Sequence, residues 1–265
     1  MIARSRQAVK EKNLVKDVAG EVLGHGVREG LEHPPLIETI SLSKRYGVRP
    51  VLRSLSLGVK AGEVYALVGP NGAGKTTVIR LITGLAFPSS GQVRLFGVDP
   101  ISQPKVKSRL GAVVEAPAAF YPYMTGRNNL RLHAKLVGKV DDKRIGEVLD
   151  MLELGNASDR KVGIYSLGMR QRLGVAAAIL NKPEVLILDE PASGMDPLSL
   201  HLVHRVLQQA AQDGAAVFIS THHLDEVNAY CNRVGILEEE CSLTRLIWAV
   251  VATVTVSRLM MCLRP

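Results

Sequence analysis

The sequence lacks a long apolar run and the apolar core of a secretory signal. Its longest apolar run, Leu246 to Val256, lies between Arg245 and Arg258 and is shorter than the roughly 18 residues that a membrane-spanning helix needs. The first sixteen residues, MIARSRQAVKEKNLVK, are charged throughout. We therefore expect a globular protein of the cytoplasm that does not itself cross the membrane.

Cysteines and aromatic residues are also scarce. Cys231, Cys241 and Cys262 are far apart and form no CxxC pair, which argues against both a disulfide framework and a zinc site. The net charge of +8 could suit nucleic acid or an anionic surface, but the basic residues are scattered and are not interleaved with aromatic ones. We therefore expect no nucleic-acid partner.

The order of apolar segments predicts an α/β fold. Residues 1–35 have no sustained apolar period and end in His33-Pro34-Pro35, so they are expected to form a loose extension. Short β-rich segments follow, and then helical patterns from about residue 126 to residue 181. Residues 185–190 (VLILDE) and 216–221 (AVFIST) are short apolar runs next to helical stretches, as in parallel strands that helices cover on both faces.

The segment GPNGAGKTT matches the phosphate-loop pattern G-x-x-x-x-G-K-[ST] and lies between a predicted strand and a predicted helix. In such a loop glycines bend the backbone so that N–H groups face a phosphate, the lysine ammonium reaches the β- and γ-phosphate oxygens, and the hydroxyl that follows coordinates Mg²⁺. The predicted ATP-binding residues are Gly69, Pro70, Asn71, Gly72, Ala73, Gly74, Lys75, Thr76 and Thr77.

Three residues that follow the later strands complete the predicted site. Asp189 ends the strand VLILD and is expected to bind Mg²⁺ together with Thr76, while Glu190 beside it is placed to polarise the attacking water. His222 follows the strand AVFIST and offers a donor near the γ-phosphate. Its neighbour His223 need not face the same way, so the two histidines are not taken as a metal pair.

A second helix start with anion-binding character occurs in YSLGMRQR, residues 165–172. GPNGAGKTT, SLGMRQR, VLILDEP, SGMDP and STHHL occur in that order, and the set resembles the ATP-binding-cassette ATPases over about residues 36–240. The resemblance implies a P-loop NTPase (RecA-like) core, a small antiparallel β subdomain and an inserted α-helical subdomain at about residues 116–180. It also implies ATP and Mg²⁺ as ligands.

In that family the second helix start contacts ATP held by another subunit. The resemblance therefore implies a dimer of cassette domains, homomeric or heteromeric, in which Ser166 and Gly168 donate to the partner's γ-phosphate. Tyr46 would stack on adenine and Asp196 would couple the two sites. Taken singly, these residues also have structural interpretations: Ser166 as a helix cap, Asp196 as a turn or helix-cap residue, and Tyr46 as a core aromatic.

Two departures from the family pattern affect the site. Most members have LSGGQ where this chain has YSLGM, and most have a glutamine where this chain has Glu115. An acid at that position can still accept from water and reach Mg²⁺, although it adds negative charge beside the phosphates.

The stretch from Glu115 to Leu130, together with YSLGMRQR, resembles the subfamily that serves bacitracin-type and lantibiotic-type peptide exporters. Family members dock a membrane permease at the position of Phe120 to Leu130. The resemblance thus implies an ATPase subunit held at the inner face of the cell membrane by a separate permease. The alternatives are a soluble cassette ATPase that acts on nucleic acid or ribosomes, and a truncated subunit that binds ATP without turnover.

Residues 241–265 depart most from the family. They show no helical period and no known motif, where relatives continue with a glycine-rich hairpin and helices. Two interpretations stay open: a strand pair particular to this lineage, or a sequence read in the wrong frame. We favour the second.

Overall fold

A computed structural model of the chain describes residues 34–114, 120–138, 140–191, 193–222, 227, 230–240 and 243–250, with the backbone alone for residues 238–240 and 243–250. The predicted extension before residue 34, Glu115, and the predicted tail beyond residue 250 lie outside these ranges.

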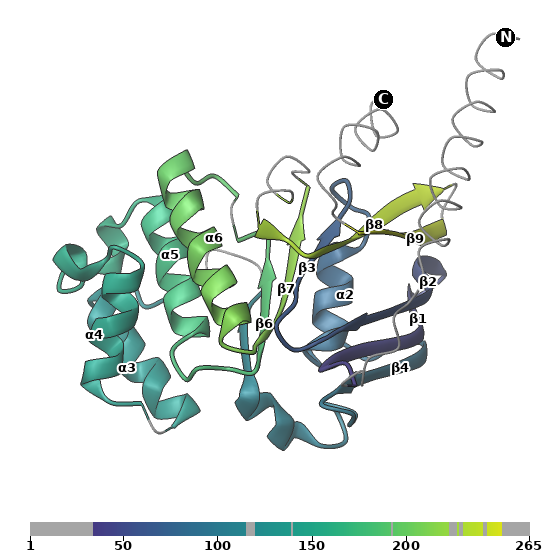
Figure 1. The fold of residues 1–265 in the computed structure, drawn as a ribbon, viewed down its shortest axis with the longest axis horizontal. Helices are drawn as coiled ribbons and strands as arrows, with labels where there is room; N and C mark the ends of the chain where they lie inside the picture. The colour runs from purple at the N-terminus through teal and green to yellow at the C-terminus, as the bar shows by residue number, and fades with distance from the viewer. Residues whose placement is uncertain are drawn as a thin grey trace, which may run out of the picture.

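A six-stranded sheet forms the centre of the molecule, in the order β5-β6-β7-β3-β8-β9 (Figure 1). The first five of these strands run parallel and β9 runs antiparallel to β8. Their bounds are β3 Val64–Val68, β5 Leu110–Val113, β6 Val185–Asp189, β7 Ala216–Thr221, β8 Arg233–Glu240 and β9 Leu243–Val250. The parallel arrangement and the predicted α/β class are therefore confirmed.

Alternate residues of the central strand β3 enter two different cores. Val64, Ala66 and Val68 pack in a core with residues of α5 (Leu167–Ala178) and α6 (Pro197–Gln212). Tyr65 and Leu67 pack in a second core with residues of α2 (Lys75–Ile82). Because side chains alternate across a strand, this pattern places helices on both faces of the sheet, as Figure 1 shows.

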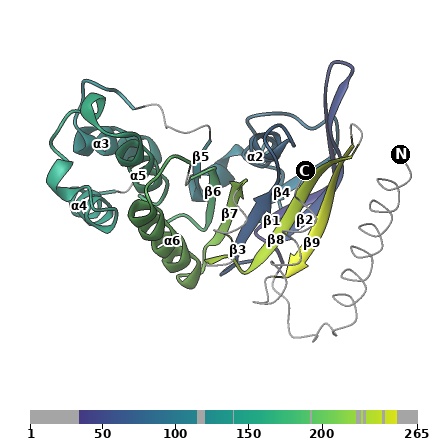
Figure 2. The ribbon, with the colours of Figure 1, turned by 90° about the horizontal axis from the view of Figure 1, so that it is seen from above.

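A three-stranded antiparallel sheet lies on the α2 side of the molecule (Figure 2). It has the order β2-β1-β4, with bounds β1 Ile37–Tyr46, β2 Arg49–Val59 and β4 Ser90–Leu95. Its buried residues, such as Leu42 and Leu95, share the core of α2. This sheet is the small antiparallel β subdomain that the resemblance implied.

Helices α3 (Gly126–Val137) and α4 (Asp142–Met151) lie beside α5 at the far end of the molecule from the antiparallel sheet (Figure 2). The Thr125 hydroxyl accepts from the Asn128 N–H at the start of α3, and Asp141 accepts from the Arg144 N–H at the start of α4. Such caps satisfy N–H groups that a helix leaves unpaired. Short 3₁₀ helices are η1 Pro104–Arg109, η2 Gly155–Ala157 and η3 Val162–Ile164.

The first part of the atypical tail forms a strand. Residues of β9 pair with β8 in register from Glu240↔Leu243 to Arg233↔Val250. A strand pair at this place is what the first of the two interpretations of the tail predicts. Within the described ranges, no helix is both long enough and apolar enough to cross a membrane.

A buried histidine on α6 makes the stability of the fold dependent on pH. His204 is 7% exposed and stacks on Tyr230 with ring centroids 3.6 Å apart. Burial, and to a lesser degree the charge of His201, lower the pKa of His204 from 6.5 to about 4. The unfolded chain therefore binds more protons than the folded chain between these pH values, and stability falls as pH falls through this window.

We expect His204→Phe, which keeps an aromatic ring against Tyr230, to reduce that loss of stability. In the parent chain the free energy of unfolding should drop on the order of 1–2 kcal/mol more between pH 6.5 and pH 4 than in the variant. Urea unfolding at several pH values measures the difference. Gln212→Asn, at an exposed position of the same helix without a titratable group, is the control; equal acid sensitivity of parent and His204→Phe would refute the assignment.

Candidate nucleotide site

The carboxyl ends of β3, β6 and β7 meet at one edge of the sheet. The parallel register sets Val68 beside Thr221 and Asp189 beside Ser220. The phosphate loop follows β3, while Glu190 and His222 follow β6 and β7. The topology thus brings together residues that lie more than 140 positions apart in the sequence.

Two glycines of the phosphate loop have backbone positions that a side chain would disturb. Gly74 is the N-cap of α2 and has a φ of 101°, in the left-handed region. A Cβ atom at Gly69 would lie 2.5 Å from the carbonyl oxygen of Leu237, on β8. These residues let the loop turn sharply from β3 into α2 against the neighbouring strand.

Lys75 lies at the centre of the candidate site and is 5% exposed. Its Nζ donates to the carbonyl oxygens of Gly69 and Pro70, at 2.7 and 3.1 Å, and lies 3.2 Å from Glu190 Oε1. The other carboxylate oxygen of Glu190 lies 2.6 Å from Nδ1 of His222. The Glu190 carboxylate is therefore held between an ammonium and an imidazole.

Oxygen atoms suited to a hard cation lie beside this group. Thr76 Oγ1 donates to Asp189 Oδ2 at 2.8 Å. Within the described residues there is no cluster of three or more His, Cys, Asp or Glu side chains that would hold a metal. Mg²⁺ does not require one, because it keeps several waters and binds through one or two protein oxygens together with substrate phosphates. The Thr76 and Asp189 oxygens thus fit Mg²⁺ bound with a nucleotide.

The second helix start lies on α5, in the helical part of the molecule. Ser166 is the N-cap of α5, and its Oγ accepts from the Met169 N–H at 3.2 Å. A Cβ atom at Gly168 would meet nothing within 4 Å. In the described part of the chain no interaction joins Ser166 to Lys75, Asp189 or Glu190. The predicted structural role of Ser166 as a cap is present in the single chain.

Asp196 is likewise a cap, at the start of α6. Its carboxylate accepts from the N–H groups of Leu198 and Ser199 and from the Ser199 hydroxyl, at 3.1, 3.0 and 2.7 Å. The bonds from Ser199 hold the pKa of Asp196 below its usual value, so this carboxylate is ionised at neutral pH. The loop before it is tied to α5, because Gln171 donates to the Ser193 carbonyl and Leu167 lies over Gly194.

Tyr46 lies at the end of β1, beside the turn into β2. Its ring is 46% exposed, and Lys44 Nζ lies 4.7 Å from the ring centroid. It is therefore not a core aromatic, and about half of its surface is open to solvent. Glu115 lies outside the described residues.

Ser220 and Gln171 take part in this region but were absent from the sequence prediction. Ser220 contacts both Asp189 and Glu190. The usable signal was the position of Ser220 as the penultimate residue of the strand AVFIST, which precedes His222. Gln171 lies one turn into the helix that follows Ser166, and an amide there gives no sequence signal of its own.

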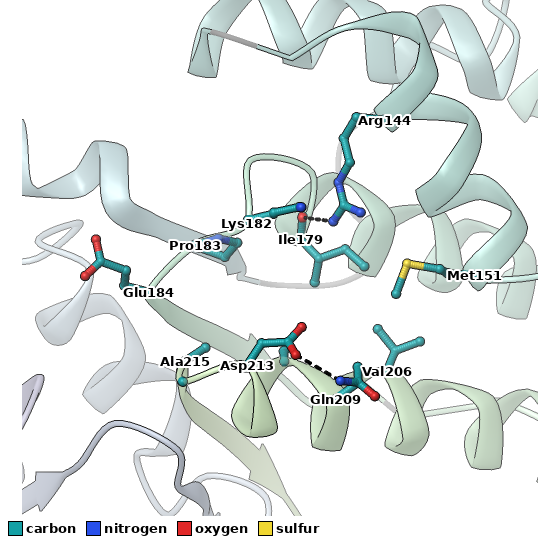
Figure 3. Close-up of a pocket in the computed structure, with 12 residues that line it drawn as sticks. Arg144, Met151, Ile179, Lys182, Pro183, Glu184, Val206, Gln209, Asp213 and Ala215 are labelled. Atoms are coloured by element: carbon teal, nitrogen blue, oxygen red, sulfur yellow. Dashed lines mark hydrogen bonds between the residues drawn. The ribbon is translucent and has the colours of Figure 1, made fainter.

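A pocket of about 490 Å³ lies at the opposite edge of the sheet, where β6 and β7 begin (Figure 3). Arg144 and Met151 of α4 line it together with Val206 and Gln209 of α6. Arg144 donates to the carbonyl of Ile179 across it. None of the predicted site residues lines this pocket.

Comparison with known proteins identifies the same family that the motifs resemble. The sequence profile described as ABC transporter matches residues 52–193. The chain is 41% identical over 206 residues to the bacitracin transport ATP-binding protein BcrA of Bacillus licheniformis, covering 77% of this chain and 67% of that protein. It is 34% identical over 204 residues to the lantibiotic transport ATP-binding protein SrtF of Streptococcus pyogenes, covering 77% and 87%.

Solved structures share the fold. One described as the ATP-binding subunit of an ABC transporter superposes with a TM-score of 0.75 and 29% identity, covering 86% of this chain and 94% of that one. A dimeric bacterial ABC transporter cassette gives a TM-score of 0.73 at 22% identity, covering 82% and 99%. The second likeness bears on the fold alone.

Proposed function

The chain belongs to the ABC transporter family as an ATP-binding subunit with ATPase activity, and we propose that its ATP hydrolysis powers a separate permease that exports a peptide antibiotic or other drug-like compound. The observation that carries the proposal is the position of Glu190 between Lys75 and His222 at the mouth of the phosphate loop. The carboxylate of Glu190, as a base, there contacts both a phosphate-binding cation, Lys75, and an imidazole, His222.

ATP would bind through the phosphate loop. Backbone N–H groups between Asn71 and Thr77 would face the β-phosphate, and the α2 N-terminus favours its negative charge. The Lys75 ammonium exchanges its bonds to the Gly69 and Pro70 carbonyls for bonds to phosphate oxygens. Tyr46, with its exposed ring, stacks on the adenine.

The metal ligands in this proposal are Thr76 and Asp189, with Glu115 as a further acid. The Thr76 hydroxyl donates its hydrogen to Asp189, so the lone pairs of its oxygen remain available to coordinate a cation. When bound, Mg²⁺ neutralises charge that develops on the β- and γ-phosphate oxygens.

Glu190 acts as the general base in this proposal. Once phosphate draws Lys75 away, the carboxylate can accept a proton from water, and His222 Nδ1, 2.6 Å away, holds its other oxygen in place. The left-handed backbone of Glu190, with a φ of 47°, turns this side chain away from the course of β6. Strained backbone of this kind occurs often at functional sites.

A second cassette domain completes the site. ABC cassettes are known to form dimers, as in the dimeric relative, and the α5 N-terminus of one chain would close over ATP held by the other. Within the described residues the Ser166 oxygen accepts from its own helix, so its hydroxyl hydrogen can donate outward, beside the open space at Gly168. Asp196 then lies near the interface on a loop tied to α5.

The permease would contact the segment that precedes α3. Tyr121 and Tyr123 are 47% and 67% exposed, and their rings lie 5.7 Å apart. This segment is bonded to the residues before Ser166: the Val162 N–H donates to the Met124 carbonyl at 2.9 Å, and the Gly163 N–H to the Pro122 carbonyl at 2.8 Å. Main-chain hydrogen bonds therefore connect the tyrosine segment to the residues just before the α5 N-terminus.

The cargo class rests on the relatives, whose names specify transport of bacitracin and of lantibiotics. Both are peptide antibiotics. Since the permease forms the path for the cargo, its binding to this chain also fixes the location, at the inner face of the cell membrane.

We expect Lys75→Ala and Glu190→Gln to separate binding from turnover. Lys75→Ala loses nucleotide affinity because the loop loses its only buried cation among the described residues. Glu190→Gln keeps that affinity and lowers ATP turnover by about 100-fold or more, the usual contribution of a general base. Fluorescent nucleotide binding and phosphate release measure the two effects.

Exposed residues provide matched controls for both substitutions. Lys135→Ala and Glu153→Gln change the same side chains at exposed positions and should leave binding and turnover as in the parent. Turnover by Glu190→Gln at the parent rate would show that the base is another residue.

We also expect the tagged Glu190→Gln chain to recover a polytopic membrane protein from detergent-solubilised membranes in the presence of ATP and Mg²⁺. A Tyr121→Ser/Tyr123→Ser double variant should recover much less of it. Leu136→Ser, at a still more exposed apolar position on α3, should recover as much as the parent. A folded chain that binds ATP but recovers only soluble proteins or RNA would overturn the transport proposal.

A further inference from the structure

Ser220 is a fully buried polar residue at the edge where the candidate site forms. It lies on β7 directly beside Asp189 of β6 and is 0% exposed. A buried hydroxyl is costly unless its hydrogen-bonding capacity is used. Its partners therefore indicate what the residue is for.

Both partners belong to the proposed catalytic machinery. The Ser220 hydroxyl donates to Asp189 Oδ1 at 2.5 Å, and its oxygen accepts from the Glu190 N–H at 3.0 Å. The Ser220 carbonyl accepts from the same N–H at 3.2 Å. One side chain thus contacts the proposed metal ligand and the backbone of the proposed base.

These bonds fix the plane of the Asp189 carboxylate. Ser220 holds Oδ1 and Thr76 holds Oδ2, at 2.5 and 2.8 Å. With a hydroxyl on each oxygen, the carboxylate cannot rotate without losing a charge-assisted hydrogen bond. Without the Ser220 hydroxyl, Thr76 alone among the described residues would orient the Asp189 carboxylate.

The same hydroxyl supports the unusual backbone of Glu190. A left-handed φ of 47° is unfavourable for a residue with a Cβ atom. The bonds from the Glu190 N–H to Ser220 hold the chain in that turn just after β6. The side chain of Glu190 leaves the sheet from there toward Lys75 and His222.

We propose that Ser220 is a positioning residue that sets the Asp189 carboxylate toward Mg²⁺ and the Glu190 carboxylate toward water. The inference rests on the proposed roles of Asp189 and Glu190. In this proposal Ser220 acts through Asp189 and Glu190, without contacting nucleotide or metal itself. It acts as a partner of a metal ligand, a class of residue whose loss typically costs about 10- to 100-fold in metal affinity or activity.

The test is a Mg²⁺ titration of the binding of a fluorescent, non-hydrolysable ATP analogue to parent, Ser220→Ala and Ser220→Thr chains. We expect Ser220→Ala to raise the half-saturating Mg²⁺ concentration by about tenfold or more, with Mg²⁺-free analogue affinity within about twofold of the parent. Its kcat for ATP should fall by a similar factor. Ser220→Thr, which restores a hydroxyl, should recover most of both.

Thr39→Val is the matched control. Thr39 is a 2% exposed hydroxyl on β1 that donates to the Leu55 carbonyl and accepts from the Leu57 N–H, so it has the same bond pattern remote from the phosphate loop. It should lower the melting temperature and leave the Mg²⁺ titration unchanged.

Three outcomes would overturn the proposal. One is a folded Ser220→Ala chain with the Mg²⁺ dependence and kcat of the parent. Another is an equal shift of the Mg²⁺ titration in Thr39→Val, which would make the effect one of general stability. The third is a Ser220→Thr chain that melts like the parent but behaves as Ser220→Ala. Failure of Glu190→Gln to lower turnover would instead reject the base, and leaves the Mg²⁺ titration interpretable because that titration needs no hydrolysis.

Discussion

The parallel pairing of β3, β6 and β7 is the constraint on which the candidate site depends. Neighbouring parallel strands end at one edge, so the phosphate loop, the Asp189–Glu190 pair and His222 meet although they come from distant parts of the sequence. Helices on both faces bury these strands completely. The sheet thereby holds the polar segments at its edge in place. The Thr76 and Ser220 hydroxyls both lie within hydrogen-bonding distance of Asp189.

Several residues stabilise the fold of a single chain and also have a role in the proposed dimer. Ser166 and Asp196 cap α5 and α6, and the same helix starts would face a partner's nucleotide. These uses are compatible, since a cap fixes the direction of a helix end and of the N–H groups around it. Bonds between residues 122–124 and residues 162–163 join the proposed permease contact to the α5 start. The proposed coupling would therefore use bonds that also hold the local structure together.

The sequence was sufficient to predict the sheet, the phosphate loop and the inserted helices, because each has a strong local pattern. Apolar runs identified β6 and β7, and the glycine spacing identified the turn before Lys75. Ser220 belongs to the STHHL motif, but the motif did not specify its role, because its partner Asp189 lies on another strand, 31 residues away. The ion pair between Lys75 and Glu190 also depends on tertiary contact. The preference for a misread tail came from the missing helical period, the missing motif and the departure from the family pattern; the structure adds that β9 pairs along the length of β8.

The most direct test of the central claim is the structure of the Glu190→Gln chain with ATP and Mg²⁺. We expect two chains with ATP between them, Lys75 of one chain on the β- and γ-phosphates, and Ser166 and Gly168 of the other chain against the same γ-phosphate. We also expect adenine on Tyr46. A nucleotide held by one chain alone, with Lys75 still bound to the Gly69 and Pro70 carbonyls, would contradict the claim.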